Sequence, residues 1–363
     1  MKLNTSNGIE NLMIFTANEL HKFAAATLEA SGFTREESLA TADSLILSNL
    51  MGYDSHGVVR VIEYIESLEE GAAISGMGLS ILNDTANGCA ADGQLCLGQV
   101  QMPRLLDHLF KKTEDNSVVT GTIRNCGHIG RLGEWVERIA EKGFVGLIAV
   151  NDNGALQCVA PPGGKEARTS TNPIAFGIPL ARQAAFTLDI STSSVAIGKI
   201  KLSYLSGEKC APGLIQNSDG ITTINPAVLF EEPTGALLPM GGYKGFGLSM
   251  IVDCMVAGLS GGFTPPAPEG TPLVNNVLVG IWNPEKFSGI EHMQEQAEKY
   301  LNFVRQTKPT NPEDPVRVPG DWSKTERVKR TKNGIPLTQG VVDALNKKAE
   351  QYFSPSLEEF FNT

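Results

Sequence analysis

The stretch "RNCGHIGRLGEWVERIAEKGFVGLIAVN", residues 124–151, decides which kind of α/β fold the chain can have. It follows a β-type run, opens a helix with glycines at every third position, and ends in an apolar run typical of a buried strand. The spacing G-x-x-G-x-x-G differs from the dinucleotide fingerprint, and the strand ends in Asn151 instead of an acidic residue. The pattern therefore disfavours a Rossmann domain. It leaves His128 in a glycine-lined turn that a ligand can approach closely, or as a structural histidine.

The character of the sequence changes on either side of this stretch. Residues 16–71 are typical of three helices, two of them opened by Thr-x-x-Glu capping boxes. From residue 77 to about 244, short β-type runs alternate with helical segments, and further helical patterns follow. We therefore predict a helical domain built from both chain ends, residues 1–76 and 245–363, and a mixed α/β domain over residues 77–244.

Composition excludes several classes of function. A net charge of −10 argues against nucleic-acid binding, because no basic face is available to displace counterions. The one dense basic run, "RVKRTK" at 327–332, is interpreted as a solvated surface loop. The six cysteines form no C-x-x-C pair, which favours reduced thiols in the cytoplasm. No run of 18 apolar residues predicts a membrane span, and the first residues lack the apolar core of a signal peptide.

The first candidate for chemistry is "SHGVVR", residues 55–60. The unperturbed pKa of imidazole is about 6.5, so His56 can give and take a proton within one turnover. The guanidinium of Arg60 can hold a carboxylate through two parallel hydrogen bonds. If a helix begins at Gly57, both side chains point to nearly the same side. The alternative is an N-capping Ser55 and a surface His–Arg pair.

Three further stretches combine polar side chains with turn signals. "RTSTNPIAFGIP" (168–179) has hydroxyl and amide groups just before a strand, and "LDISTSSVAIGKI" (188–200) places four hydroxyl residues after Asp189. "LPMGGYKGFGLSM" (238–250) opens a helix with glycines and Lys244, a combination that attracts anions. It is not a Walker A loop. The alternatives are polar turns and a glycine-rich helix start packed on a neighbour.

Six stretches, taken in order, resemble one family, the malate/L-lactate dehydrogenase type of 2-oxoacid oxidoreductase. This family includes ureidoglycolate dehydrogenase, sulfolactate dehydrogenase and 2,3-diketogulonate reductase. The likeness runs from about residue 15 to 345. The stretches are "SHGVVR", "GHIGRLG", "STNPIAFGIP", "LDISTS", "GGYKGFGLS" and "VPGD".

The resemblance implies a non-Rossmann, sulfolactate-dehydrogenase-like α/β (α+β) fold in which the 77–244 domain binds NAD or NADP. It implies hydride transfer between that cofactor and a small 2-oxo or 2-hydroxy acid, by a homodimer without a metal. His56 would be the proton donor, with Ser55 and Arg60 beside it, and His128 matches a second histidine assigned this role in some members. The implied cofactor contacts are Asn172, Thr187, Leu188, Asp189, Ile190, Ser191, Thr192, Ser193, Tyr243, Lys244, Pro319, Gly320 and Asp321.

One departure concerns the cofactor segment, where members often have Asp-Met-Ala-Thr-Ser and this chain has Asp189-Ile190-Ser191-Thr192-Ser193. The change leaves the cofactor site plausible and does not separate NAD from NADP. Two other functions stay open. Some members reduce a cyclic imino acid, whose acceptor is C=N, and a catalytically silent relative would only bind a carboxylate. Retention of both His56 and His128 disfavours the silent protein.

Overall fold

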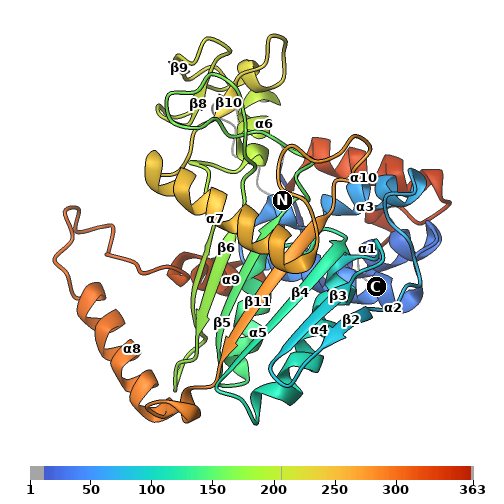
Figure 1. The fold of residues 1–363 in the computed structure, drawn as a ribbon. Coiled ribbons are helices and arrows are strands. Elements are labelled where there is room, and N and C mark those ends of the chain that lie inside the picture. The colour runs from blue at the N-terminus through green and yellow to red at the C-terminus, as the bar shows by residue number, and fades with distance from the viewer. Residues whose placement is uncertain (1–11, 206, 361–363) are drawn as a thin grey trace. The chain divides into compact units, whose positions relative to one another are not determined.

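A computed structural model of the chain describes residues 12–205 and 207–360. The chain divides into two compact units, which we call the chain-end unit (Met1–Gly76 with Asp321–Thr363) and the central unit (Met77–Gly320). Figure 1 labels their elements in chain order. None of the described helices combines the length and apolar character needed to cross a bilayer.

The central unit is built on a seven-stranded mixed sheet in the order β2-β3-β4-β11-β5-β6-β7 (Figure 1). Only the β3–β4 pair is parallel, and the other five pairs are antiparallel. The sheet therefore lacks the run of parallel strands that defines a Rossmann domain. The strands are β2 (Ser80–Asp84), β3 (Gly88–Asp92), β4 (Val118–Cys126), β5 (Val145–Asn151), β6 (Ile174–Ile178), β7 (Phe186–Ile190) and β11 (Asn275–Trp282).

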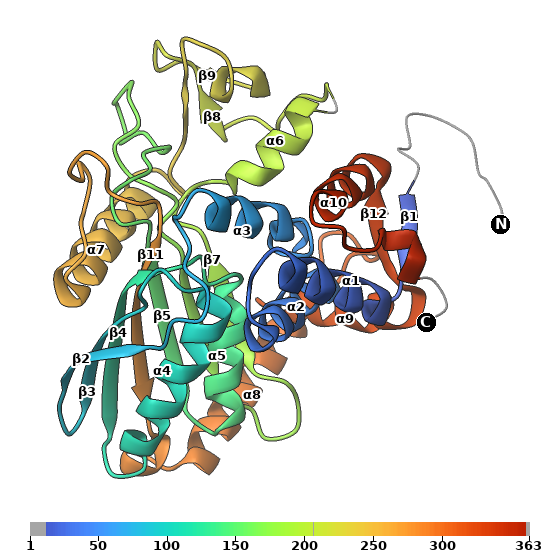
Figure 2. The ribbon, with the colours of Figure 1, turned by 90° about the vertical axis from the view of Figure 1, so that its right-hand side faces the viewer.

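Helices cover both faces of this sheet, as Figure 2 shows. α4 (Gly98–Thr113) and α5 (Leu132–Glu141) pack on one face, and α7 (Tyr243–Ser260) packs on the other. Alternate side chains of the central strands point to opposite faces, so β5 is buried on both sides. Ile148 thus joins the cluster with α4 and α5, whereas Ala149 joins the cluster with α7.

The rest of the central unit is a small three-stranded sheet and two further helices. The sheet has the order β10-β8-β9 and a core of its own, which includes Val159, Ile200 and Leu237. The elements are β8 (Ile215–Gln216), β9 (Thr222–Thr223), β10 (Ala236–Leu237), α6 (Ile197–Leu205), α8 (Ile290–Arg305), η2 (Pro226–Leu229) and η3 (Pro284–Lys286).

The chain-end unit joins the two ends of the sequence. β1 pairs antiparallel with β12, placing Phe15 opposite Ile335 (Figure 2). The capping boxes predicted at Thr16 and Thr34 are both present, each with its Glu three residues on. The elements are β1 (Leu12–Phe15), α1 (Ala17–Ala30), α2 (Arg35–Leu50), η1 (Asp54–His56), α3 (Arg60–Glu69), α9 (Asp321–Asn333), β12 (Ile335–Thr338), α10 (Gln339–Gln351) and η4 (Leu357–Phe360).

Two features of this architecture differ from expectation. Residues 245–320, expected with the chain ends, lie in the central unit because β11 pairs with both β4 and β5 and α7 packs on these strands. The basic run 327–332 is not a solvated loop but part of α9. The mixed α/β class itself is as predicted.

Candidate functional site

Ser55 and His56 lie in η1, a single 3-10 turn between α2 and α3. The Ser55 hydroxyl and His56 Nδ1 are 3.1 Å apart, so the hydroxyl orients the imidazole. The helix expected to begin at Gly57 begins instead at Arg60, because Gly57 is extended (φ −91°, ψ −155°). The condition under which His56 and Arg60 would point to the same side, a helix that begins at Gly57, is therefore not met.

Arg60 turns back toward the histidine by another route. Its Nε donates to the main-chain carbonyl of Ser55 at 2.7 Å, and its Nη1 pairs with Glu63 one turn along α3. Nη2 makes no hydrogen bond to any residue that the structure describes, and the side chain is 24% exposed. Arg60 thus has one nitrogen left to donate to a ligand.

His128 lies in the loop between β4 and α5 and is half-buried. Its Nδ1 accepts a hydrogen bond from Gly130 N at 3.3 Å. The loop itself is fixed, because Ile129 N donates to Asn275 Oδ1 and Gly98 leaves no room for a side chain against the loop backbone. His128 belongs to the central unit, whereas His56 belongs to the chain-end unit.

One of the glycines after His128 binds a carboxylate of this same chain. Gly133 N, in the first turn of α5, donates to the Asp189 carboxylate at 2.7 Å. Burial raises the pKa of Asp189 above its ordinary value, although the Arg131 guanidinium and the Gly133 N–H counter part of this shift. A helix N-terminus is a natural anion site, and here the anion is Asp189. Its side chain therefore organises the end of β7.

The hydroxyl residues after β7 form a tight turn. Ser191 Oγ and Thr192 Oγ1 both donate to the carbonyl of Thr171, at 3.1 and 2.9 Å, and Ser193 Oγ donates to the carbonyl of Val195. Met240 N donates to the Thr192 carbonyl at 2.9 Å. The turn thus joins the segment before β6 to the segment before α7.

The start of α7 is open at two glycines. Gly241 and Gly242 have φ of +59° and +64°, and a Cβ built on either would meet no atom within 4 Å. Tyr243 is 73% exposed, and Lys244 is exposed beside it. This glycine-rich helix start therefore leaves backbone accessible, as close approach of a ligand requires.

The other predicted cofactor residues lie along β7 or on the "VPGD" turn. Gly320 (φ +87°) lies against β7, where an added Cβ would be 3.2 Å from the Thr187 carbonyl. Asp321 is the first residue of α9 and belongs to the chain-end unit. Leu188 and Ile190 are half-buried strand residues, and Pro319 directly precedes Gly320.

Asn172, one of the predicted cofactor residues, belongs to a buried polar cluster between the end of β5 and the start of β6, whose other members the sequence analysis missed. Asn172 Nδ2 donates to Asp253 Oδ2 at 2.6 Å, and Asn151 Nδ2 donates to Asp253 Oδ1 at 3.0 Å. Asp152 is only 9% exposed, and neither of its oxygens has a hydrogen-bond partner among the described residues. The signal was available, because Asp152 directly follows the strand that ends in Asn151.

The environment of Asp152 is unusual for a carboxylate. Burial, with a smaller contribution from the charge of Asp253, raises the pKa of Asp152 to about 6. The Ser170 hydroxyl and the main-chain N–H groups of Asp152 and Leu156 lie near enough to counter part of this shift, but none of them makes a hydrogen bond of good geometry. A buried acceptor without a donor is costly, so such a group points to a ligand that supplies the donor.

These observations fit a bound dinucleotide. Asp152 Oδ1 and Oδ2, Thr169 Oγ1 and Asn172 Oδ1 are buried atoms without partners among the described residues. They can accept or share hydrogen bonds with the amide and hydroxyl groups of a nicotinamide nucleotide. Met240, which directly precedes the open glycines 241 and 242, donates to the Thr192 carbonyl, and Thr192 N donates to the carbonyl of Thr171, next to Asn172. The buried acceptor oxygens and the accessible backbone thus suit the cofactor that the sequence implies.

One group of side chains in the described residues brings metal-ligating atoms together. The ligating atoms of Asp84, Cys89 and His108 all lie within 4.8 Å of one another. However, Lys112 Nζ lies 2.9 Å from Asp84 Oδ1, the same oxygen that His108 contacts. Because the Lys112 ammonium already neutralises the Asp84 carboxylate, we interpret these side chains as an ion-pair cluster and not as a metal site.

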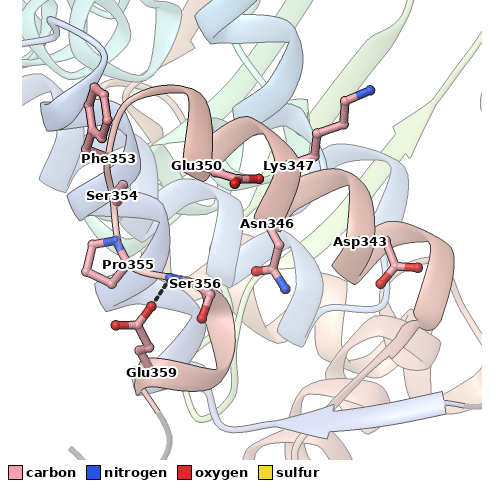
Figure 3. Close-up of a pocket in the computed structure, with 9 residues that line it drawn as sticks. All are labelled: Asp343, Asn346, Lys347, Glu350, Phe353, Ser354, Pro355, Ser356 and Glu359. Atoms are coloured by element: carbon pink, nitrogen blue, oxygen red, sulfur yellow. Dashed lines mark hydrogen bonds between the residues drawn. The ribbon is translucent and has the colours of Figure 1, made fainter.

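A groove in the chain-end unit contains none of the predicted site residues. It lies between the end of α10 and η4, where Ser356 N donates to Glu359 Oε1 at 2.8 Å (Figure 3). Phe353 stands fully exposed at its rim. Its mixed charges offer no arrangement of acid, base or nucleophile.

Comparison with known proteins places the chain in a family. A family model for malate/L-lactate dehydrogenase matches residues 15–346. The chain is 31% identical over 347 residues to hydroxycarboxylate dehydrogenase B of Escherichia coli strain K12, which covers 94% of this chain and 95% of that protein. It is 30% identical over 326 residues to Delta(1)-pyrroline-2-carboxylate/Delta(1)-piperideine-2-carboxylate reductase of Pseudomonas syringae pv. tomato, covering 88% and 91%.

A solved structure shares the architecture. Sulfolactate dehydrogenase from Methanocaldococcus jannaschii matches with a TM-score of 0.83 and 26% identity, covering 96% of this chain and 99% of that chain. The predicted sulfolactate-dehydrogenase-like fold is thereby confirmed. Membership of a dehydrogenase family implies a nicotinamide cofactor. The chain belongs to the malate/L-lactate dehydrogenase family, and it is an oxidoreductase that acts on small hydroxy or oxo acids.

Proposed function

We propose that the chain interconverts a small 2-oxo acid and its 2-hydroxy acid, using NADH or NADPH. When bound, the nicotinamide supplies the hydride for reduction or accepts it in oxidation. The observation that carries the assignment of the acid–base residue is the Ser55–His56 contact of 3.1 Å, with the Arg60 guanidinium bonded to the same turn. This arrangement puts an oriented imidazole beside a carboxylate-binding group.

His56 performs the proton transfer in this proposal. Its imidazole donates a proton to the carbonyl oxygen during reduction and takes it back from the hydroxyl during oxidation. Arg60 Nη2 donates to the substrate carboxylate, which fixes the orientation of the 2-carbon. His128, held through its Nδ1 by Gly130, is the alternative acid–base residue.

Residues of the central unit hold the cofactor. Asp152 and Asn172 accept hydrogen bonds from its amide or hydroxyl groups, and the Ser191–Ser193 turn shapes the adjoining backbone. Tyr243 and Lys244 act at the exposed start of α7, and Lys244 supplies positive charge for a phosphate. Thr187 and Gly320 hold the "VPGD" turn against β7.

An assay of cofactor oxidation tests the reaction. NADH and NADPH are each offered with a panel of 2-oxo acids and, separately, with cyclic imino acids. We expect turnover with at least one 2-oxo acid and a clear preference for one cofactor. Turnover restricted to cyclic imines would replace the substrate class, since that is the activity named for the Pseudomonas syringae relative. Absence of cofactor binding by fluorescence would favour a silent carboxylate-binding protein.

We also propose that the protein is a homodimer that works in the cytoplasm. α7 exposes an apolar stripe that includes Met250, Ile251, Met255 and Leu259. A monomer would leave this apolar surface in water, whereas a dimer can bury it. All six cysteines are free thiols, which suits a reducing compartment. Light scattering during gel filtration should give twice the chain mass, and Ile251→Glu should shift the protein to a monomer. A monomeric wild type would contradict the dimer.

A further inference from the structure

His56 lies on a short main-chain turn, residues Asp54–His56. Two main-chain bonds close it, from His56 N to the Tyr53 carbonyl at 2.9 Å and from Gly57 N to the Asp54 carbonyl at 3.1 Å. A single 3-10 turn has poor hydrogen-bond geometry, and extended Gly57 interrupts the path to α3. The position of the imidazole therefore depends on the residues that hold the turn in place as well as on the turn itself.

Asn49, near the end of α2, brackets the turn from both sides. Its Nδ2 donates to Asp54 Oδ1 at 2.7 Å, and its Oδ1 accepts from Val58 N at 2.7 Å. The amide is buried and packs so closely on Gly57 that an added Cβ there would lie 2.3 Å from Asn49 Cγ. One side chain thus holds the residues just before Ser55 and just after Gly57.

Arg330, from α9, completes this arrangement. Its Nη1 and Nη2 donate to the two carboxylate oxygens of Asp54 at 2.6 and 3.0 Å, and Nη1 also donates to the Asn49 carbonyl at 2.7 Å. Glu326 accepts from Nε at 3.2 Å, and the Arg330 side chain is only 11% exposed. Every edge of the guanidinium therefore has a partner.

We propose that Arg330, Asp54 and Asn49 form a clamp that positions His56 for proton transfer. The inference rests on the proposed function, because it assumes that His56 is the acid–base residue. The clamp residues touch no reacting group in this proposal and act through the geometry of the turn. A displacement of about 1 Å in a catalytic group can cost roughly 100-fold in rate, so loss of the clamp lowers turnover.

The chemistry of the clamp requires arginine. A planar guanidinium can meet both oxygens of Asp54 and a carbonyl at once, whereas an ammonium is a compact charge without this fork. Arg330→Lys keeps the charge and loses the two-point geometry. Arg330→Met keeps only an unbranched apolar stem and loses both the charge and the two-point geometry. The order of turnover should therefore be wild type, then Arg330→Lys, then Arg330→Met.

Steady-state kinetics on the full chain tests the clamp. The variants are Arg330→Lys, Arg330→Met and Asp54→Asn, with Arg327→Met as control, because Arg327 is exposed on the same helix. We expect kcat to fall roughly 10- to 100-fold in Arg330→Met and less in the other two. The Kd for NAD(P)H should stay unchanged in all of them. A general loosening of the fold would weaken cofactor binding as well, so a lower kcat with an unchanged Kd points to the clamp. The double variant Asp54→Asn/Arg330→Met should be no slower than Arg330→Met.

Two results would overturn the clamp. One is a kcat of Arg330→Lys and Asp54→Asn indistinguishable from that of Arg327→Met, which decides the matter even if Arg330→Met fails to fold. The other is a fall in kcat accompanied by an equal loss of cofactor affinity. Either result counts against the clamp only if His56→Gln has lost turnover, which shows that His56 takes part in the reaction. If His56→Gln retains turnover, the proposed role of His56 fails first.

Discussion

Arg330 and Asp54 form a two-point ion pair, with nitrogen–oxygen distances of 2.6 and 3.0 Å, although 276 positions of sequence separate them. The pair joins α9, near one end of the chain, to the turn that carries Ser55 and His56. It shows why the chain-end unit needs both ends of the sequence. A segment that looks like a basic surface run thereby contributes to the candidate site.

Substitution of the proposed acid–base residue should reduce turnover without unfolding the protein. His56→Gln removes the group that exchanges the proton while keeping hydrogen-bonding capacity, so we expect kcat to fall roughly 10²- to 10⁴-fold. His128→Gln, measured beside it by cofactor oxidation, is the matched comparison. If His128→Gln shows the larger loss, the acid–base role passes to His128.

Arg60 should act mainly on substrate binding. Arg60→Met removes a charged hydrogen bond to the carboxylate, worth about 1.5–3 kcal/mol, and should raise KM for the 2-oxo acid roughly 10- to 100-fold. Glu63→Gln is informative in the opposite direction. Glu63 competes for Nη1 of Arg60, so its neutralisation should lower KM. An unchanged KM in Arg60→Met would mean that Arg60 does not bind the substrate carboxylate.

The turn after β7 can be tested through two glycines of α7. A Cβ at Gly245 would lie 2.3 Å from the Met240 carbonyl oxygen and 2.7 Å from that of Thr192, whereas one at Gly247 would meet no atom within 4 Å. Gly245→Ala should therefore displace the turn and weaken NAD(P)H binding, measured by fluorescence titration. Gly247→Ala should bind normally, with up to about 1 kcal/mol of added helix stability. Equal Kd values for the two variants would place the cofactor elsewhere.

Asp152 should make stability depend on pH. Its pKa is about 6 in the folded protein, whereas the ordinary value for an aspartate is 3.8, so the folded state favours the protonated form. The stabilisation from protonation is complete below pH 3.8 and is lost as pH rises through 6. At pH 8 the buried charge costs about 3 kcal/mol, since one unit corresponds to about 1.4 kcal/mol.

Asp152→Asn should remove this cost while weakening cofactor binding. Urea unfolding should show the variant more stable than wild type at pH 8, with the gap narrowing as pH falls toward 5. Asp219→Asn is the control, because Asp219 is exposed. A gap that does not change with pH would mean that Asp152 is ionised equally in both states.

Local signals in the sequence predicted local structure well. The Thr-x-x-Glu boxes mark the starts of α1 and α2, and the apolar run before Asn151 is β5. The same signals could not place β11, because its pairing with β4 and β5 depends on contacts far apart in sequence. For this reason residues 245–320 were expected in the domain formed by the chain ends, whereas they lie in the central unit.

The candidate site was predictable in part. The hydroxyl turn after β7 and the glycines before α7 could be picked out by residue type, and the structure brings them together through Met240 and Thr192. The position of Asp152 directly after β5 was visible in the sequence, but its burial without a hydrogen-bond partner is a property of packing and could not be predicted from residue type. The helix assumed for His56 and Arg60 failed because Gly57 is extended.

The central claim is hydride transfer from a nicotinamide cofactor to the 2-carbon of a small oxo acid. The most direct measurement uses cofactor deuterated on both faces of the nicotinamide C4, followed by mass spectrometry of the product. The account predicts one deuterium on C2 of a 2-hydroxy acid, with its formation strongly slowed in His56→Gln. Deuterium found only in the product of a cyclic imine, or in no product of any 2-oxo acid, would contradict it.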